Sequence, residues 1–184
     1  MLKPCDETMT AYDLAKQLAQ CLDVHAHISS KVDWDACFQF DPDKGTVFCA
    51  MSAVSDIAES EKNDPRTASS YKAVLKMADS AFDSCGDEMP EPVRYAVFCC
   101  LHEFGHHCQS IEWSAEALRN QDAIRKNMVD AAKKDAQKAA DDGLVPELVY
   151  QIFENKYRSI PIEKDADERA AAMIGRLLDI WQER

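Results

Sequence analysis

The chain lacks the features that mark membrane, secreted and disulfide-rich proteins. Its 184 residues contain no apolar run approaching the roughly 20 residues of a membrane span, and residues 1–7 contain none suited to a signal peptide. The eight cysteines form no C-x-x-C pair, which favours small buried side chains over a disulfide framework. We therefore expect a cytoplasmic protein that does not enter membranes.

Positive charge is also scarce. Asp and Glu number 33 against 21 Lys and Arg, which gives a net charge of −12 and a pI of about 4.8. Binding to nucleic acid draws on clustered Lys and Arg that neutralise phosphates, so this balance argues against a nucleic-acid partner and against anionic membranes. A cationic peptide or a basic protein would be attracted instead.

The composition, with 46% hydrophobic and 29% charged residues, is that of an ordinary globular protein, and the length predicts one domain over residues 1–184. Apolar residues recur mainly at helical spacing. We expect helices over 10–25, 65–85, 91–111 and 146–158, another beginning at 161, and a long, half-exposed helical insertion at about 113–142. Residues 36–40 and 46–51 flank a turn rich in Asp, Pro and Gly and predict a β-hairpin. The predicted fold class is α+β, mainly helical with a small antiparallel hairpin or sheet.

The segment 100–107, Cys-Leu-His-Glu-Phe-Gly-His-His, contains the pattern H-E-x-x-H within the predicted helix 91–111. Residues four apart lie on one face of a helix, so His102 and His106 can offer two imidazole nitrogens to one metal ion. Glu103 lies beside them, where its carboxylate can hold a metal-bound water and act as a general base. The pattern predicts metal-assisted hydrolysis.

A catalytic zinc site takes three protein ligands and leaves the fourth position open, so a third ligand is required. No histidine follows His107, and the metzincin continuation requires Gly and His where this chain has Gln109 and Glu112. A glutamate is the remaining donor. Among the downstream glutamates only Glu163 is followed four residues later by an aspartate, Asp167, on the same face of a helix. We expect Glu163 to bind the metal and Asp167 to accept the distal N–H of a ligating histidine.

Through His-Glu-Phe-Gly-His at 102–106 and Glu-Lys-Asp-Ala-Asp at 163–167 the chain resembles the gluzincin metallopeptidases, the thermolysin-like clan. The resemblance implies one Zn²⁺ per chain, a zinc metalloendopeptidase activity and a peptide or protein substrate. It also implies the roles of particular residues: metal ligands His102, His106 and Glu163, general base Glu103, and hydrogen-bond partner Asp167. Because little chain follows the glutamate helix, the protein is more similar to the minimal gluzincins or the ImmA/IrrE-type peptidases. It departs from the small members in the long interval 107–162 between the motifs.

In gluzincins an edge strand near the active-site helix pairs with the substrate backbone, and strand 46–51 is the candidate for that role. The same strand fits equally a hairpin that only closes the core. Two other functions are compatible with the motifs. One is a narrow-specificity regulatory protease that acts on a single repressor-like partner. The other is a non-catalytic, zinc-stabilised interaction module whose working surface is the helix at 113–142.

Two other groups of residues have side chains that can bind metals, but their spacing favours a packing role. Cys21 and His25 are four apart on an amphipathic helix, close to His27, a spacing that more often reflects packing than a second metal cluster. His107 is adjacent to His106 but points about 100° away around the helix, which favours a packed or hydrogen-bonded histidine.

Overall fold

The computed structural model describes residues 6–31, 37–83 and 89–183. Within them the chain forms seven helices and a three-stranded sheet, which confirms the α+β, mainly helical fold class. The elements are α1 (Ala11–Leu22), β1 (His27–Lys31), β2 (Phe38–Asp41), β3 (Thr46–Ala50), α2 (Val54–Asn63), α3 (Ala68–Phe82), α4 (Glu91–Glu112), α5 (Ala115–Asp141), α6 (Pro146–Arg158) and α7 (Pro161–Gln182). None of the described helices combines the length and the apolar character needed to cross a membrane.

The helix starts follow local sequence signals. The hydroxyl of Thr10 accepts a hydrogen bond from Asp13 N at 3.1 Å, and the hydroxyl of Ser114 accepts one from Ala117 N at the same distance. Helices α4, α6 and α7 each carry proline in the first turn, where its missing N–H and fixed φ are tolerated. The predicted helix 65–85 corresponds to α3, and its expected end near Cys85 lies outside the described residues.

The sheet corrects the prediction that residues 46–51 form an edge strand. β3 is the central strand, because β1 pairs with it in parallel while β2 pairs with it antiparallel. Its backbone groups are therefore engaged on both sides and cannot pair with a substrate. The predicted hairpin is present as β2 and β3, whereas β1 has a polar His-Ile-Ser-Ser-Lys sequence that gave no strand signal.

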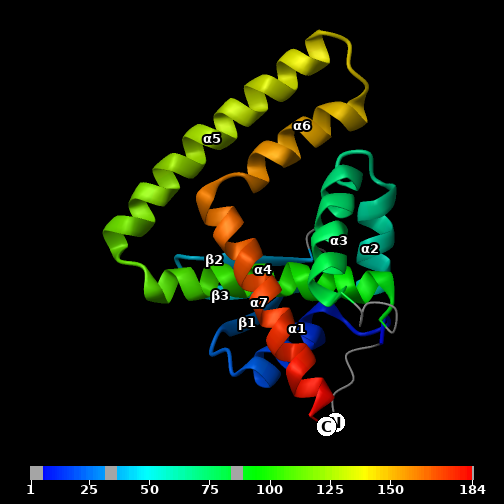
Figure 1. Cartoon of the computed structure of the whole chain (residues 1–184), viewed down its shortest axis with the longest axis vertical. Coiled ribbons are helices and arrows are strands. Elements are labelled where there is room, and N and C mark those ends of the chain that lie inside the picture. The colour runs from blue at the N-terminus through cyan, green and yellow to red at the C-terminus, as the bar shows by residue number, and fades with distance from the viewer. Residues whose placement is uncertain (1–5, 32–36, 84–88, 184) are drawn as a thin grey trace.

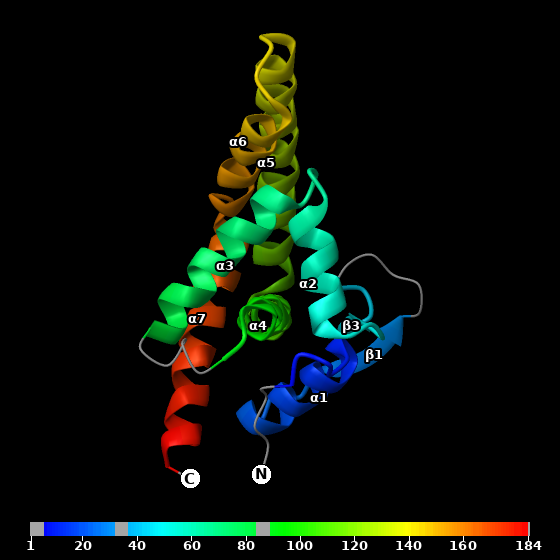
Figure 2. The same cartoon turned by 90° about the vertical axis from the view of Figure 1, so that its right-hand side faces the viewer.

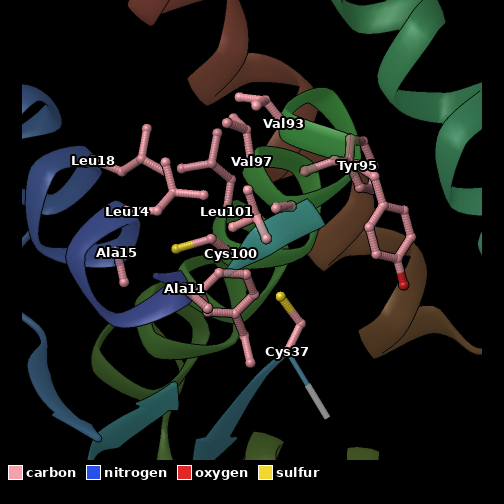
Figure 3. Close-up of a cluster of buried hydrophobic side chains, with 14 of the residues drawn as sticks. Ala11, Leu14, Ala15, Leu18, Cys37, Val93, Tyr95, Val97, Cys100 and Leu101 are labelled. Carbon is pink, nitrogen blue, oxygen red and sulfur yellow. The ribbon is translucent and has the colours of Figure 1, made fainter. Parts of the chain in front are cut away.

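Helix α4 is the centre of the molecule, and in Figure 2 it is seen nearly end-on with the other elements around it. Its apolar side chains pack against α1 and the sheet on one side, as Figure 3 shows for Leu14 and Leu18 of α1 beside Val97 and Leu101 of α4. All four side chains are at most 2% exposed. A helix buried on nearly all sides holds its polar residues in fixed positions.

Helix α7 crosses α4 at close range (Figure 1). At the crossing a Cβ added to Gly105 would lie 3.0 Å from both the Cα and the carbonyl oxygen of Ala166. These are backbone atoms, which cannot turn aside as a side chain does. Gly105 lies between Glu103 and His106, and Ala166 lies between Glu163 and Asp167, so the same two small residues that permit the close approach bring the two sequence motifs together.

Helices α5 and α6 form an antiparallel pair that extends from the rest of the molecule as an arm (Figure 1). Only Ala132 and Ala139 are buried in α5, and only Glu154 is buried in α6. The long helix predicted at about 113–142 corresponds to α5, and most of its residues are exposed. The lower part of the arm lies over the end of α4 and contributes side chains to the site described below.

Candidate metal centre

Two imidazoles from α4 and one carboxylate from α7 converge where the helices cross. Nε2 of His102 lies 3.1 Å from Nε2 of His106, and Oε2 of Glu163 lies 3.4 Å and 3.3 Å from these two nitrogens. With metal–donor distances of about 2.0–2.1 Å, tetrahedral coordination places donor atoms about 3.3–3.4 Å apart. The three residues therefore match the spacing of metal ligands and could hold one metal ion.

The Glu163 carboxylate is fully buried, and its two oxygens have different surroundings. Oε1 accepts a hydrogen bond from Arg125 Nε at 2.6 Å, whereas Oε2 receives no hydrogen bond from any described residue. Although burial raises the pKa of Glu163, the neighbouring imidazoles and the Arg125 guanidinium together lower it, so the carboxylate is charged. A charged, buried oxygen without a hydrogen bond is costly, and a cation between it and the two imidazoles would satisfy it.

Each imidazole is held by a hydrogen bond on the side away from Glu163. Nδ1 of His102 donates to Oδ1 of Asp167 at 2.7 Å, and Nδ1 of His106 donates to Oε1 of Gln109 at 2.8 Å. These bonds direct Nε2 of each ring toward Glu163, so Nε2 is the atom that would bind a metal once it has lost any proton. Burial lowers the pKa of His102, but Asp167 and Glu163 outweigh it and raise the pKa to about 9, so metal binding at neutral pH releases a proton.

Gln109 connects the two helices and was not identified from the sequence. While its carbonyl oxygen accepts from His106, its Nε2 donates to the carbonyl oxygen of Ile162 at 2.8 Å and to Asp165 Oδ2 at 2.8 Å. The side chain is 1% exposed, so these bonds are shielded from water. Gln109 is three residues after His106, and helical spacing alone would have placed it beside the ring.

Glu103 lies next to the three donors without joining them. Its Oε2 accepts a hydrogen bond from the backbone N–H of Phe40 at 2.7 Å, which connects the carboxylate to strand β2. Glu103 lines a cleft of about 530 Å³ that opens over the donor atoms. The cleft is walled by β2, α4, α5 and the residues around Glu163, namely Gln39, Phe40, Pro42, His102, Glu103, His106, Gln109, Ser110, Leu118, Asp122, Arg125, Tyr157, Ile162 and Glu163.

The arm supplies two polar groups to this cleft that no sequence pattern indicated. Arg125 of α5 reaches Glu163, and its Nη2 donates to the hydroxyl of Tyr157 at 3.3 Å. Burial raises the pKa of Tyr157, so its hydroxyl stays protonated and can donate a hydrogen bond. Neighbouring Arg158 faces the other side, where Nη1 donates to Asp167 Oδ1 at 2.9 Å and Nε donates to Glu154 Oε1 at 2.8 Å.

The remaining histidines lie apart from this centre. Among the described residues, the group of His102, His106 and Glu163 is the only one whose donor atoms converge for a metal. His25 is exposed, and Nδ1 of His27 is paired with the Thr46 hydroxyl at 3.0 Å, so they form no second site with Cys21. His107 is buried and packs edge-on against Phe40 with ring centroids 5.8 Å apart, as a packing role predicts.

Compared with protein families, curated proteins and solved structures, the chain matches none of them. Its function is therefore inferred from the chemistry of the site itself.

Proposed function

We propose that the protein is a zinc-dependent peptidase of gluzincin type, with His102, His106 and Glu163 as zinc ligands. The observation that carries the proposal is the triangle of donor atoms 3.1–3.4 Å apart, which borders an open cleft next to Glu103. Three protein donors beside an accessible cleft are the arrangement of a catalytic zinc site, whereas structural zinc sites are closed by four protein ligands.

The donor set favours zinc over other common ions. Two imidazole nitrogens suit transition metals and disfavour Ca²⁺ and Mg²⁺, which prefer oxygen ligands. Asp167 strengthens His102 as a donor, as carboxylates that bind ligating histidines do. When bound, zinc would supply a Lewis acid and lower the pKa of a coordinated water.

Glu103 is the proposed general base. Its carboxylate lines the cleft beside the two histidines and would accept a proton from the attacking water and deliver it to the leaving amine. The hydrogen bond from Phe40 N fixes the position of one carboxylate oxygen, so the group does not have to be ordered during the reaction. Across the cleft, the Tyr157 hydroxyl is the proposed donor to the carbonyl oxygen of the scissile bond.

Strand β2 is the proposed partner of the substrate backbone, in place of β3. Phe40 directs its N–H toward Glu103 and away from β3, and in an antiparallel strand the N–H and C=O of one residue point the same way. The carbonyl of Phe40, and the backbone groups of Phe38 two residues earlier, therefore face the free edge of the sheet. An extended peptide can pair with these groups whatever its side chains are.

The proposal is tested by replacing Glu103 with Gln in the full, zinc-loaded chain. We expect cleavage of a denatured protein mixture, followed by the appearance of new amino termini, to fall about 10²–10⁴-fold while zinc content stays at the wild-type level. Glu112→Gln, an exposed glutamate on the same helix, is the matched control and should retain activity.

If the protein is instead a non-catalytic interaction module, Glu103→Gln should have no effect on its function. If Glu103→Gln leaves the biological effect of the protein intact while His102→Ala unfolds the chain, the metal is structural and the peptidase proposal is wrong. A narrow-specificity protease would leave the protein mixture uncut but would still lose cleavage of its own partner in Glu103→Gln.

A further inference from the structure

A second cavity lies against the metal centre on the side of α2 and α3. It has a volume of about 170 Å³ and shares His102, Glu103 and Tyr157 with the larger cleft. At about 30 Å³ per water this volume corresponds to on the order of five or six waters, which is the size of one long side chain and too small for a folded segment.

The free edge of β2 leads from the cleft to this cavity. Phe40 lines the cleft and Phe38 lines the cavity, and both residues direct their backbone groups away from β3. Two residues of a strand span about 6.6–6.8 Å. A peptide that pairs with β2 beside Glu103 therefore has a neighbouring side chain at the cavity, which makes the cavity a pocket for a residue that flanks the scissile bond.

The walls of the cavity combine apolar surface with two carboxylates, of which Glu103 is already assigned as the proposed general base. Phe38, Val74, Phe98 and the ring of Tyr95 provide apolar surface. The other carboxylate, Glu61 of α2, accepts a hydrogen bond at Oε2 from the Tyr95 hydroxyl. Figure 3 shows that the Tyr95 ring leaves α4 on the side opposite α1, with its hydroxyl directed away from the apolar cluster.

Of the two carboxylates at the cavity, Glu61 of α2 is the one that takes no part in the proposed catalysis, and the neutral Tyr95 hydroxyl donates a hydrogen bond to it. Arg158 is occupied by Glu154 and Asp167, and Glu103 is held by Phe40 N. Burial raises the pKa of Glu61, which is the expected effect of desolvation on a carboxyl.

We propose that this cavity selects a lysine or arginine side chain next to the scissile bond, with Glu61 as the anionic partner of the substrate's charge. The apolar walls would cover the methylene stem, and the carboxylate would receive the ammonium or guanidinium group at the end. A net charge of −12 would further attract basic peptides. This assignment rests on the proposed peptidase function, but binding of the basic side chain can be measured without catalysis.

The first test measures binding to the full, metal-loaded chain. The probes are the amide-capped amino acids N-acetyl-lysine methylamide, N-acetyl-arginine methylamide and N-acetyl-norleucine methylamide. We expect a basic probe to bind at least tenfold more tightly than norleucine, and Glu61→Gln to remove that difference. Glu59→Gln, which removes an exposed charge from the same helix, should keep it. Equal binding of all probes to the wild type overturns the proposal, as does an equal loss in Glu59→Gln.

The second test uses two peptides that differ only in lysine against norleucine at each position flanking a cleaved bond. The ratio of their kcat/KM values should fall at least tenfold in Glu61→Gln, and part of the preference should remain in Glu61→Asp, which also serves if Glu61→Gln folds poorly. Cleavage without a basic preference overturns the pocket assignment alone. Tight binding of basic probes without any cleavage overturns the peptidase function and leaves the pocket standing.

Discussion

The crossing of α4 and α7 and the arm of α5 and α6 are built in opposite ways. In α4, 12 of 22 residues are buried and in α7, 8 of 22, whereas α5 buries 2 of 27 and α6 1 of 13. All three donor residues come from the crossing. The arm contributes Arg125 and Tyr157, which contact Glu163 or line the cleft without being donors.

This difference separates two requirements of a metal-dependent site. Donor atoms must keep their positions to within a few tenths of an ångström, which dense packing and buried hydrogen bonds provide. Groups that meet a substrate can lie on a lightly packed element, because such elements open at low free-energy cost. We therefore expect substitutions at the crossing to affect folding and metal affinity together, and those in the arm to act mainly on the cleft.

The largest effect should come from adding a single methyl group at the crossing. In Gly105→Ala the new Cβ would lie 3.0 Å from backbone atoms of Ala166, so the helices must separate. We expect the free energy of unfolding to fall by about 1–3 kcal/mol, with weaker metal binding. In Gly175→Ala the Cβ would meet nothing within 4 Å, and the same change should stabilise α7 by about 0.5–1 kcal/mol. Chemical denaturation of both variants checks the contrast, and equal stabilities would contradict the close crossing.

A smaller effect is expected when the support of His102 is removed. Asp167→Ala deletes the acceptor of His102 Nδ1 and of Arg158 Nη1. Metal affinity, measured by competition with a chelator, should fall about 10–100-fold while the fold persists. Glu168→Gln, an exposed change on the same helix, should leave the affinity unaltered. An unchanged affinity in Asp167→Ala would show that this contact does not set the orientation of the ring.

The contact between Arg125 of the arm and Glu163 of the crossing should have a smaller effect on metal affinity. Arg125 is 47% exposed in its side chain, although it bonds to the buried Oε1 of Glu163. Arg125→Gln removes a hydrogen bond that positions Glu163 and also a positive charge that repels a metal ion, and both effects are partly screened by water, so we expect metal affinity to change by no more than about tenfold. Arg119→Gln, at an exposed position of the same helix, is the control. A loss as large as that of Asp167→Ala would place Arg125 with the crossing rather than with the arm.

The smallest effect concerns Glu61, the cavity-lining carboxylate that lies outside the proposed catalytic groups. Because burial raises the pKa of Glu61, the folded protein binds its proton more tightly than the unfolded chain does. Its contribution to stability is therefore present below the unfolded pKa of about 4.3 and is lost as pH rises through the folded pKa. Glu61→Gln has no such proton to lose, so its stability relative to the wild type should increase as pH rises from about 4 to about 8. Thermal unfolding of both proteins across this range measures the difference. A constant difference across that range would contradict the raised pKa.

The sequence predicted the parts of the site that depend on local spacing. His102 and His106 are four apart on one helix, and Glu163 and Asp167 are four apart on another, so each pair shares a face in any structure that keeps the helices. Three other residues reach the site only because the arm and β2 pack against α4 and α7, and no local sequence pattern predicts that packing. They are Arg125, Tyr157 and Phe40. The central position of β3 was missed for the same reason, because its parallel partner β1 is short and polar.

Metal content tests the central claim most directly. The full chain, purified without added metal and without a His-tag, should contain close to one zinc per chain, and Glu163→Ala should lose it or bind it far more weakly because one of three donors is gone. Full retention of zinc in Glu163→Ala, or a wild-type protein that binds no zinc when it is supplied, would contradict the assignment of the centre.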